Sequence, residues 1–300
     1  MKKIDLSIII VSYNTKDFLK KCIESIQDGI GSKLKYEIIV VDNASSDGTV
    51  EEIKSFDKLR TRFKFIANDK NLGFSKANNI GVKHATGEYL LFLNPDTIIN
   101  PETLETMIDF MDKNKDAGAA TCKVVLPNGE IDDSSHRGFP TPWNAFCYFS
   151  GIYKIFPKSR FFSGYTLGFM DLSKTHEIDS GAGSFLLVRR EAGEDIGWWD
   201  EDYFFYGEDL DFCYKLKQKK WKVYYVPTVF ILHHKGVSGG IKEISKEITT
   251  ADAKTKKLAT KERFSAMRIF YKKHYQEKYP KFITWFIFGA INLKERLTGI

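Results

Sequence analysis

The sequence has few cysteines, and none of them has the spacing of a metal ligand. Cys22, Cys122, Cys147 and Cys213 are scattered along the 300 residues. Disulfide frameworks and zinc sites use regular cysteine patterns, so we expect four reduced, buried thiols of an intracellular protein. The first residues also lack the charged start, apolar middle and small-residue cleavage site of a secretory signal. We therefore expect a cytoplasmic location.

Long hydrophobic runs, internal repeats and low-complexity tracts are absent from the sequence as well. The apolar run from Phe282 to Ile291 is much shorter than the ~20 residues that a membrane-spanning helix needs. We expect it to lie on a membrane rather than to cross one. What remains is an ordinary globular composition, rich in Phe and Tyr, in a chain long enough for one large domain with an appendage.

Positive charge is concentrated at the C-terminal end. The formal net charge is +6, yet residues 235–300 carry 15 Lys or Arg against 6 Asp or Glu, which leaves −3 for residues 1–234. Aromatic side chains beside lysines suit a membrane interface better than a nucleic-acid groove. We therefore predict a peripheral membrane contact through this tail, at the inner face of the cell membrane, and no nucleic-acid partner. The aromatic residues are Tyr271, Tyr275, Tyr279, Phe282, Trp285, Phe286 and Phe288.

Apolar strands alternate with amphipathic helices along most of the chain. This alternation, with short connections, predicts an α/β fold with a mostly parallel central sheet flanked by helices. From residue 242 onward we expect helices with a basic face. The expected strands are 6–12, 36–41, 63–67, 88–93, 117–125, 184–188, 221–226 and 229–232, and the expected helices are 16–27, 74–83, 101–114 and 208–219.

Residues 126–178 interrupt the alternation with an irregular insertion rich in Gly, Pro, Ser and aromatic residues. A long irregular insertion in a compact domain is usually functional or mobile. Because it departs from the core pattern and carries many aromatic residues, we predict that it recognises an acceptor molecule.

The strand at 88–93 ends in the turn Asn94-Pro95-Asp96. Pro95 restricts the backbone of Asn94 and stiffens the turn, so the carboxylate of Asp96 is presented at its tip. Ligands of open α/β sheets bind beyond the carboxyl ends of the strands, where an acidic residue can hold a divalent cation and the cation a diphosphate. Taken alone, the same turn could simply open the next helix.

Other polar groups follow strands that we expect to end at the same edge of the sheet. They are Ser12-Tyr13-Asn14, Asp42 and His233. A carboxylate at position 42 could accept a hydrogen bond from the imide N–H of uracil or thymine. An Asx-turn at the start of a polar loop is an equally good explanation of Asp42.

Three acids stand at the start of the helix expected from residue 208, in Glu208-Asp209-Leu210-Asp211. Acids in a first turn are favoured by the helix dipole, by about 0.3–1 kcal/mol each. The acidic and aromatic residues 197–207 before them are more than a helix cap requires, so one of these carboxylates could take a proton from a hydroxyl nucleophile. The adjacent pair His233-His234 raises the prospect of a metal ligand.

The order of these motifs resembles the family 2 glycosyltransferases, inverting enzymes of the Rossmann-like GT-A fold that use nucleotide-diphosphate sugars, and among them the bacterial rhamnosyltransferase-type members. The matching motifs cover most of residues 6–238 in order. They are SIIIVSYN (7–14), VVDNASSDGT (40–49), NLGF (71–74), NNIG (78–81), LNPD (93–96), GAGSFLLVRR (181–190), the segment 200–211, and His233-His234.

The resemblance implies specific roles. Asp42 reads the pyrimidine base, Ser12, Tyr13 and Asn14 lie beside it, and Asn78 is on the donor-facing helix. Asn94 to Asp96 occupies the place of the Asp-x-Asp motif, so Asp96, helped by His233, binds Mg²⁺ or Mn²⁺. The general base is Asp209, and the acceptor side includes Gly183, Trp199, Asp200 and Glu208.

Two positions depart from the family pattern. Asn94 replaces the first acid of Asp-x-Asp, which removes a negative charge beside the metal, and rhamnosyltransferase-like members often show this. Asn78 stands where many relatives carry Arg, so neutralisation of the donor diphosphate depends more on the cation.

The expected protein is therefore a catalytic domain at 1–240 with a basic, aromatic helical extension at 241–300. We expect transfer of a sugar from dTDP-rhamnose or a UDP-sugar to a hydroxyl of a polysaccharide or lipid-linked saccharide. A sugar-phosphate nucleotidyltransferase is an alternative, but it would need a Gly-rich basic loop after the first strand, where Ser12–Thr15 offers none. A non-catalytic nucleotide-sugar-binding domain is another, against which Glu208-Asp209 and His233 argue.

Overall fold

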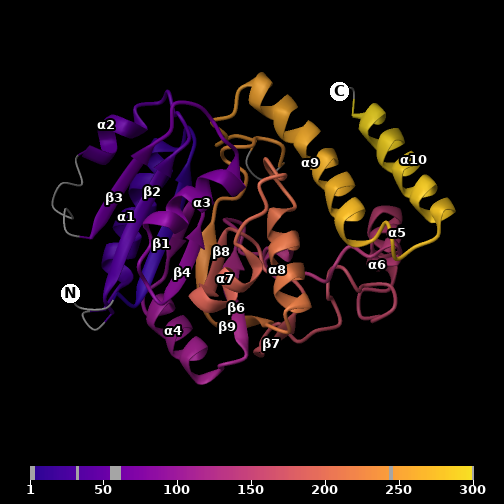
Figure 1. The fold of residues 1–300 in the computed structure, drawn as a ribbon, viewed down its shortest axis with the longest axis horizontal. Coiled ribbons are helices and arrows are strands. Elements are labelled where there is room, and N and C mark those ends of the chain that lie inside the picture. Colours follow the sequence, from indigo (N-terminus) through magenta and orange to yellow (C-terminus); the bar gives the residue numbers. More distant parts are fainter. Residues whose placement is uncertain (1–3, 32–33, 55–61, 243–245, 299–300) are drawn as a thin grey trace.

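A computed structural model describes residues 4–31, 34–54, 62–242 and 246–298. One sheet runs through the body of the protein, with helices on both of its faces (Figure 1). Across the sheet the order is β3 (Phe63–Ala67), β2 (Tyr36–Asp42), β1 (Leu6–Ser12), β4 (Tyr89–Leu93), β8 (Phe185–Arg189), β6 (Ala117–Val125), β9 (Lys222–His233) and β5 (Thr97–Ile99), while β7 (His176–Ile178) also pairs with β9.

The sheet is mostly parallel, as predicted. Strands β1 to β4 are mutually parallel, and β6 and β9 run in the same direction, because β8 is antiparallel to both β4 and β6. Strands β5 and β7 are antiparallel to β9. The carboxyl ends of β1, β2, β4, β6 and β9 and the start of β8 therefore lie along one edge of the sheet.

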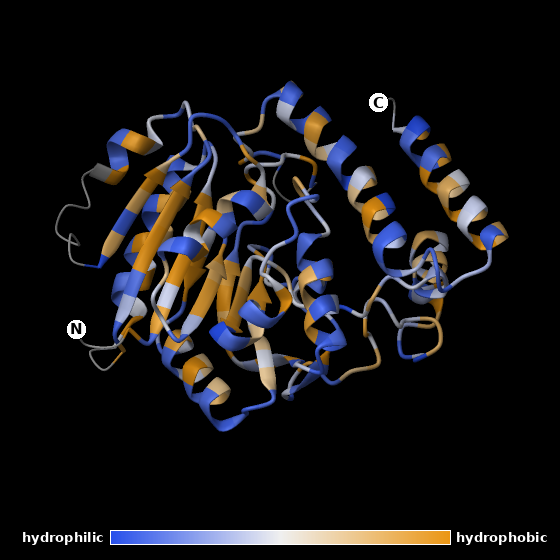
Figure 2. Cartoon of the chain, viewed as in Figure 1, coloured by the Kyte–Doolittle hydropathy of each residue, from blue (hydrophilic) through white to orange (hydrophobic). Residues whose placement is uncertain are grey.

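Alternate residues of the strands enter two separate cores, one on each face. On one face, Ile8, Ile10 and their neighbours pack with α1 (Lys16–Gly29) and α4 (Thr103–Lys113). On the other face, Ile9 and Phe92 pack with α3 (Phe74–His84), α7 (Arg190–Ile196) and α8 (Glu208–Gln218). Figure 2 shows the strands as the most uniformly apolar part of the chain, as expected for a sheet buried on both faces. The four cysteines are free and buried, which confirms their predicted state.

Two elements expected at the C-terminal side of the sheet are in fact one. Strand β9 runs from Lys222 to His233, so it contains both predicted segments, 221–226 and 229–232, except for residue 221. The register of its pairing with β6 shifts after Val226. Cys122 of β6 pairs with Val226, but the next residue of β6, Lys123, pairs with Phe230. Pro227 lies in the intervening bulge, where it need not donate a ladder hydrogen bond.

The insertion at 126–178 contains regular structure that the sequence pattern did not reveal. It holds the 3-10 helix η2 (Asp133–Ser135), α5 (Pro142–Ser150), α6 (Ile152–Ile155) and β7. Thr141 caps α5, since its side chain accepts a hydrogen bond from the backbone N–H of Asn144. Helix α2 (Thr49–Lys54), β5 and α7 are also short elements without a clear period in the sequence.

The tail forms two helices, α9 (Ala253–His274) and α10 (Lys281–Leu297), which lie side by side (Figure 1). Helix α9 packs on the body through a third apolar cluster that joins Phe270 and Tyr271 to Tyr203 and Leu210. Within the ranges described, no helix combines the length and apolarity that crossing a bilayer requires. The predicted division at residue 240/241 stays a prediction.

Candidate active site

A cavity of about 1180 Å³ opens at the carboxyl edge of the sheet. It is bounded by the loops after β1 and β4, the start of α8, the insertion, and the tail helices. This volume exceeds the ~300–1,000 Å³ typical of small-molecule sites, so it has room for more than one substrate. Of the predicted site residues, those that line it are Tyr13, Asn94, Asp96, Gly183, Glu208, Asp209 and His233.

Strand pairing brings Asp96 and His233 together. The short strand β5 follows Asp96 directly and pairs with the end of β9, so that Thr97 stands opposite His233. The backbone N–H of His234 donates to the carbonyl of Asp96 at 2.9 Å. As a result His233 Nε2 lies 3.3 Å from Asp96 Oδ1, with both side chains buried. The ring of His234 instead packs edge-on against Phe18, so His233 is the histidine that faces the site.

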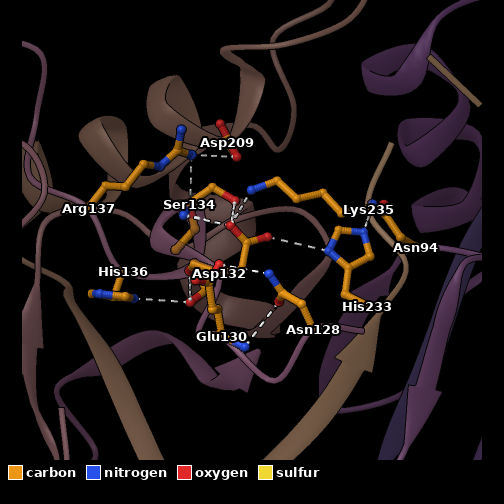
Figure 3. A network of polar contacts seen from close by, with 12 residues as sticks. Asn94, Asn128, Glu130, Asp132, Ser134, His136, Arg137, Asp209, His233 and Lys235 are labelled. Carbon is orange, nitrogen blue, oxygen red and sulfur yellow. Dashed lines mark hydrogen bonds and ion pairs between the residues drawn. The ribbon is translucent and has the colours of Figure 1, made fainter. Parts of the chain in front are cut away.

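Asp132, which the sequence analysis did not identify, lies on the other side of the same imidazole. Its Oδ2 is 3.5 Å from His233 Nδ1, and its Oδ1 accepts from Lys235 Nζ at 2.5 Å (Figure 3). Burial alone would lower the His233 pKa, but the carboxylates of Asp96 and Asp132 outweigh it and raise the pKa to about 9. Likewise, His233 and Lys235 overcome the effect of burial and hold the Asp132 pKa below its ordinary range.

The pair Asp96 and His233 fits a divalent cation that is shared with a ligand. In the parts of the chain described, no cluster of three or more His, Cys, Asp or Glu could cage a metal. Mg²⁺ and Mn²⁺ sites in phosphate-handling proteins often have one or two protein ligands, with phosphate oxygens and water completing the shell. The amide of Asn94 lies 3.4 Å from His233 Nε2, beside the same position. A ligating imidazole must be neutral, so cation binding would displace the proton of His233.

The start of α8 carries the candidate base. Asp209 Oδ2 accepts from Arg137 Nη2 at 2.7 Å, and both side chains are largely buried. Burial would lower the pKa of the Arg137 guanidinium, but the neighbouring Asp209 carboxylate outweighs burial and raises it. Glu208 is buried too, and its Oε2 has no hydrogen-bond partner among the residues that the structure describes. Burial, and then the neighbouring Asp209, raise the Glu208 pKa to about 8.

Asp211 has a structural role instead. It is fully buried and accepts from His274 Nε2 at 2.7 Å and from the Tyr203 hydroxyl at 3.3 Å, with Lys215 3.6 Å away. The last turn of α9 is thus tied to α8, the helix that carries Asp209 in its first turn.

The predicted base-reading residues lie just behind the cavity wall. Asp42 is fully buried at the end of β2 and accepts from both the N–H and the hydroxyl of Ser45, which is the Asx-turn that the sequence left open. Ser12 is buried and bonds Thr15, and Asn14, in the left-handed region at φ 52°, accepts from the Ser46 N–H. Contact of these residues with the pyrimidine base of a nucleotide stays a prediction.

Three further predicted residues are held away from the cavity. The amide of Asn78 donates to the Phe74 carbonyl within α3. Trp199 is 2% exposed and packs against Phe92 in the core. Asp200 accepts from Lys273 Nζ of α9 at 2.6 Å. Their placement does not support direct contact of these side chains with a donor or acceptor, whereas Gly183 and Glu208 on the predicted acceptor side do line the cavity.

Three residues of the site were not predicted from the sequence: Asp132, Arg137 and Lys235. The first two come from the polar run Asp132–Arg137, just after β6, which is parallel to β4 and ends at the same edge. This run of polar residues after a strand was the available signal. Two residues beyond His233, Lys235 reaches back to Asp132.

An acid and an imidazole suited to a divalent cation thus face a candidate base across one cavity, beyond the carboxyl ends of parallel strands. The mostly parallel sheet agrees with the fold expected from the sequence. The family model for glycosyl transferase family 2 matches residues 7–197. The chain belongs to this family, which confirms the resemblance and decides against a nucleotidyltransferase.

Similar proteins include two rhamnosyltransferases. Rhamnosyltransferase WbbL of Escherichia coli (strain K12) is 30% identical over 236 residues, 76% of this chain and 82% of that protein. N-acetylglucosaminyl-diphospho-decaprenol L-rhamnosyltransferase of Mycobacterium tuberculosis (strain CDC 1551 / Oshkosh) is 25% identical over 247 residues, 78% of each. The crystal structure of GalNAc-T7 with UDP, GalNAc and Mn²⁺ has a TM-score of 0.59 at 18% identity, covering 77% of this chain and 44% of that one, and supports the fold alone.

Proposed function

We propose that this glycosyltransferase moves a sugar from dTDP-rhamnose or a UDP-sugar, with inversion, to a hydroxyl of a polysaccharide or lipid-linked saccharide. The observation that carries the proposal is the single cavity that Asp96 and His233 share with Asp209. The names of the relatives favour rhamnose as the sugar and a lipid diphosphate saccharide as the acceptor.

In the proposed reaction, Asp209 accepts the proton of the acceptor hydroxyl as its oxygen attacks the anomeric carbon. The new carbon–oxygen bond forms while the bond to the nucleotide diphosphate breaks, and the bonding electron pair leaves with the diphosphate. A single displacement of this kind needs one base and inverts the anomeric centre, unlike the paired carboxylates of a retaining hydrolase. Arg137 holds the Asp209 carboxylate in place beside the cavity.

Asp96 and His233 would hold the divalent cation, and Asp132 would orient the imidazole from its other nitrogen. A bound cation would stabilise the negative charge that develops on the leaving diphosphate. Carboxylate partners of metal-bound histidines usually fix the ring orientation in this way. Lys235, held by Asp132, would add positive charge near the leaving diphosphate.

We also propose a cytoplasmic location at the inner face of the membrane. Several large apolar residues of α10 are exposed, among them Trp285 at 80% and Phe282 at 72%. Lysines of α9 and α10 supply the positive charge that anionic lipid attracts.

The test is a panel of nucleotide diphosphates and their sugars, with Mg²⁺ or Mn²⁺, read first by thermal shift and then by release of nucleotide diphosphate. We expect dTDP-rhamnose or one UDP-sugar to stabilise the protein in a metal-dependent way and to be turned over. Failure of every nucleotide sugar to bind would contradict the proposal.

A further inference from the structure

One segment of the insertion exposes large apolar side chains away from the cavity. It comprises residues 154–161, the end of α6 and the loop that follows it. Within it, Ile155, Phe156 and Phe161 are 71%, 50% and 62% exposed, and the described lining of the cavity includes none of them. Patches of large apolar side chains on the surface usually mark a site of interaction. Binding of a substrate in the cavity does not account for this patch.

The same segment is basic. Lys154, Lys158 and Arg160 are exposed, and residues 134–170 contain no Asp or Glu. Cations beside exposed apolar side chains suit a bilayer that contains anionic lipid, because the apolar groups enter the interface while the cations interact with the headgroups. A symmetric dimer through this patch would instead bring the positive charge of the segment against its own copy.

Hydrogen bonds and a ring contact hold the segment in one conformation. The Trp143 Nε1–H donates to the Phe161 carbonyl at 2.8 Å, and the Ser163 hydroxyl donates to the Phe156 carbonyl at 2.8 Å. The Phe156 ring stacks on Phe162 with 5.1 Å between the ring centroids. A surface that is ordered before binding loses less conformational entropy when it meets its partner.

The segment belongs to a part of the insertion that contacts α10. Helix α6 contacts α5, and Lys294 Nζ of α10 lies 3.8 Å from the ring centroid of Phe149 on α5. Figure 1 likewise shows α5 and α10 as neighbours. Helix α10 carries exposed apolar residues of its own, among them Phe282 and Trp285. Two exposed apolar patches thus belong to neighbouring elements of one chain.

We propose that residues 154–161 bind the surface of a bilayer that contains anionic lipid, as a second membrane contact of the protein. The inference rests on the proposed membrane location, which was assigned to α10, and it gives a partner to the outward-facing part of the insertion. The three exposed apolar side chains enter the interface, while the three cations stay at the level of the headgroups. Because both patches belong to one chain, binding of either one raises the effective concentration of the other at the bilayer.

The first test measures flotation of the full chain with vesicles of phosphatidylcholine and phosphatidylglycerol, without donor or acceptor. Ile155→Ser/Phe156→Ser/Phe161→Ser should weaken vesicle binding at least tenfold, because it removes the side chains that enter the interface. The three positions are exposed, so the variant should fold. The matched control is Phe230→Ser, at an exposed site of β9, which should bind as wild type does.

A second pair of variants tests the charge. Lys154→Gln/Lys158→Gln should weaken binding to the same vesicles at least fivefold at low salt, and the difference from wild type should shrink as the salt concentration rises. Lys83→Gln/Lys113→Gln removes the same net charge from exposed positions of α3 and α4. This control should change vesicle binding less than twofold.

A fluorescent label at position 161 distinguishes a membrane from a second copy of the chain. All four cysteines are buried, so a nitrobenzoxadiazole label on Phe161→Cys is confined to that position. We expect its emission to shift to the blue when vesicles are added, and a label on Phe230→Cys to show no shift. A blue shift that needs no vesicles and grows with protein concentration would assign the patch to a second copy and overturn the proposal.

Equal flotation of wild type and the triple serine variant would overturn it as well. If Phe282→Ala/Trp285→Ala then still reduces flotation, the proposed contact through α10 stands and this inference alone fails. Because these measurements contain no nucleotide sugar, their outcome is independent of the proposed glycosyl transfer.

Discussion

Arg137 Nη2 lies 2.7 Å from Asp209 Oδ2, and this contact joins the insertion to the start of α8. The insertion was expected to recognise an acceptor, but through Arg137 it also reaches the candidate base. A charge-assisted hydrogen bond from a permanent cation holds the carboxylate in one orientation at the edge of the cavity.

Asp209→Asn should abolish transfer and leave donor binding nearly intact. The amide keeps the shape of the side chain but cannot take up the proton, and general bases typically contribute about 100- to 10,000-fold to rate. The measurement is nucleotide diphosphate release with acceptor, together with calorimetry for the nucleotide. An Asn variant with full activity would show that another group is the base.

Asp96→Ala should weaken Mn²⁺-dependent binding of UDP or dTDP by at least tenfold, as it removes the buried carboxylate that faces His233. Titration calorimetry with and without Mn²⁺ measures this. Asp109→Ala, an exposed acid of α4, is the matched control. Identical metal dependence in wild type and Asp96→Ala would exclude Asp96 as a ligand.

Glu208→Gln should stabilise the protein increasingly as pH rises. The Glu208 pKa is about 8 in the folded protein and 4.5 ordinarily, so the folded state binds the extra proton. Its stabilising effect is complete below pH 4.5 and is lost as pH rises through 8. Glutamine does not titrate, so the variant does not lose this stability as pH rises. Each unit of pKa shift corresponds to up to about 1.4 kcal/mol of folding free energy.

Thermal denaturation of wild type and Glu208→Gln between pH 5 and pH 8.5 gives the answer. The difference in Tm should be small at pH 5 and several degrees at pH 8.5. Glu277→Gln, an exposed residue, should show no such trend. A constant difference across the range would mean that Glu208 is charged in the folded protein.

His274→Ala should destabilise the protein by about 3 kcal/mol, because it removes the strongest partner of a fully buried carboxylate. Tyr203 and Lys215 remain near Asp211 and limit the loss. Denaturant unfolding is the measurement, and His84→Ala, at an exposed site, is the control. Equal stability of wild type and His274→Ala would show that the contact contributes nothing.

Phe282→Ala/Trp285→Ala should reduce flotation with anionic liposomes and leave stability within about 0.5 kcal/mol of wild type, since both side chains are exposed. The control is Phe230→Ala, which removes an exposed aromatic side chain of β9 and should leave flotation unchanged. Undiminished flotation of the α10 variant would argue against membrane contact through this helix.

Local signals predicted the sheet and the acid at its edge well. The apolar run of β4 and the turn at Pro95 placed Asp96 correctly, because a buried strand and a proline turn are encoded over a few neighbouring residues. Arg137 and Asp132 were missed, since their importance depends on contacts with residues 72 and 101 positions away. Trp199 was assigned to the acceptor side, but its ring fills the core beside Phe92.

The contact between His274 and Asp211 also has a practical consequence for cloning. The family match ends at residue 197, and a truncated clone designed from motifs alone would stop near 240, before α9. Such a truncation would remove His274, a hydrogen-bond donor to the buried Asp211 carboxylate on α8, the helix that also carries Asp209. We expect that product to aggregate on expression, and the shortest useful clone to extend past Tyr275, whose side chain is buried against the body.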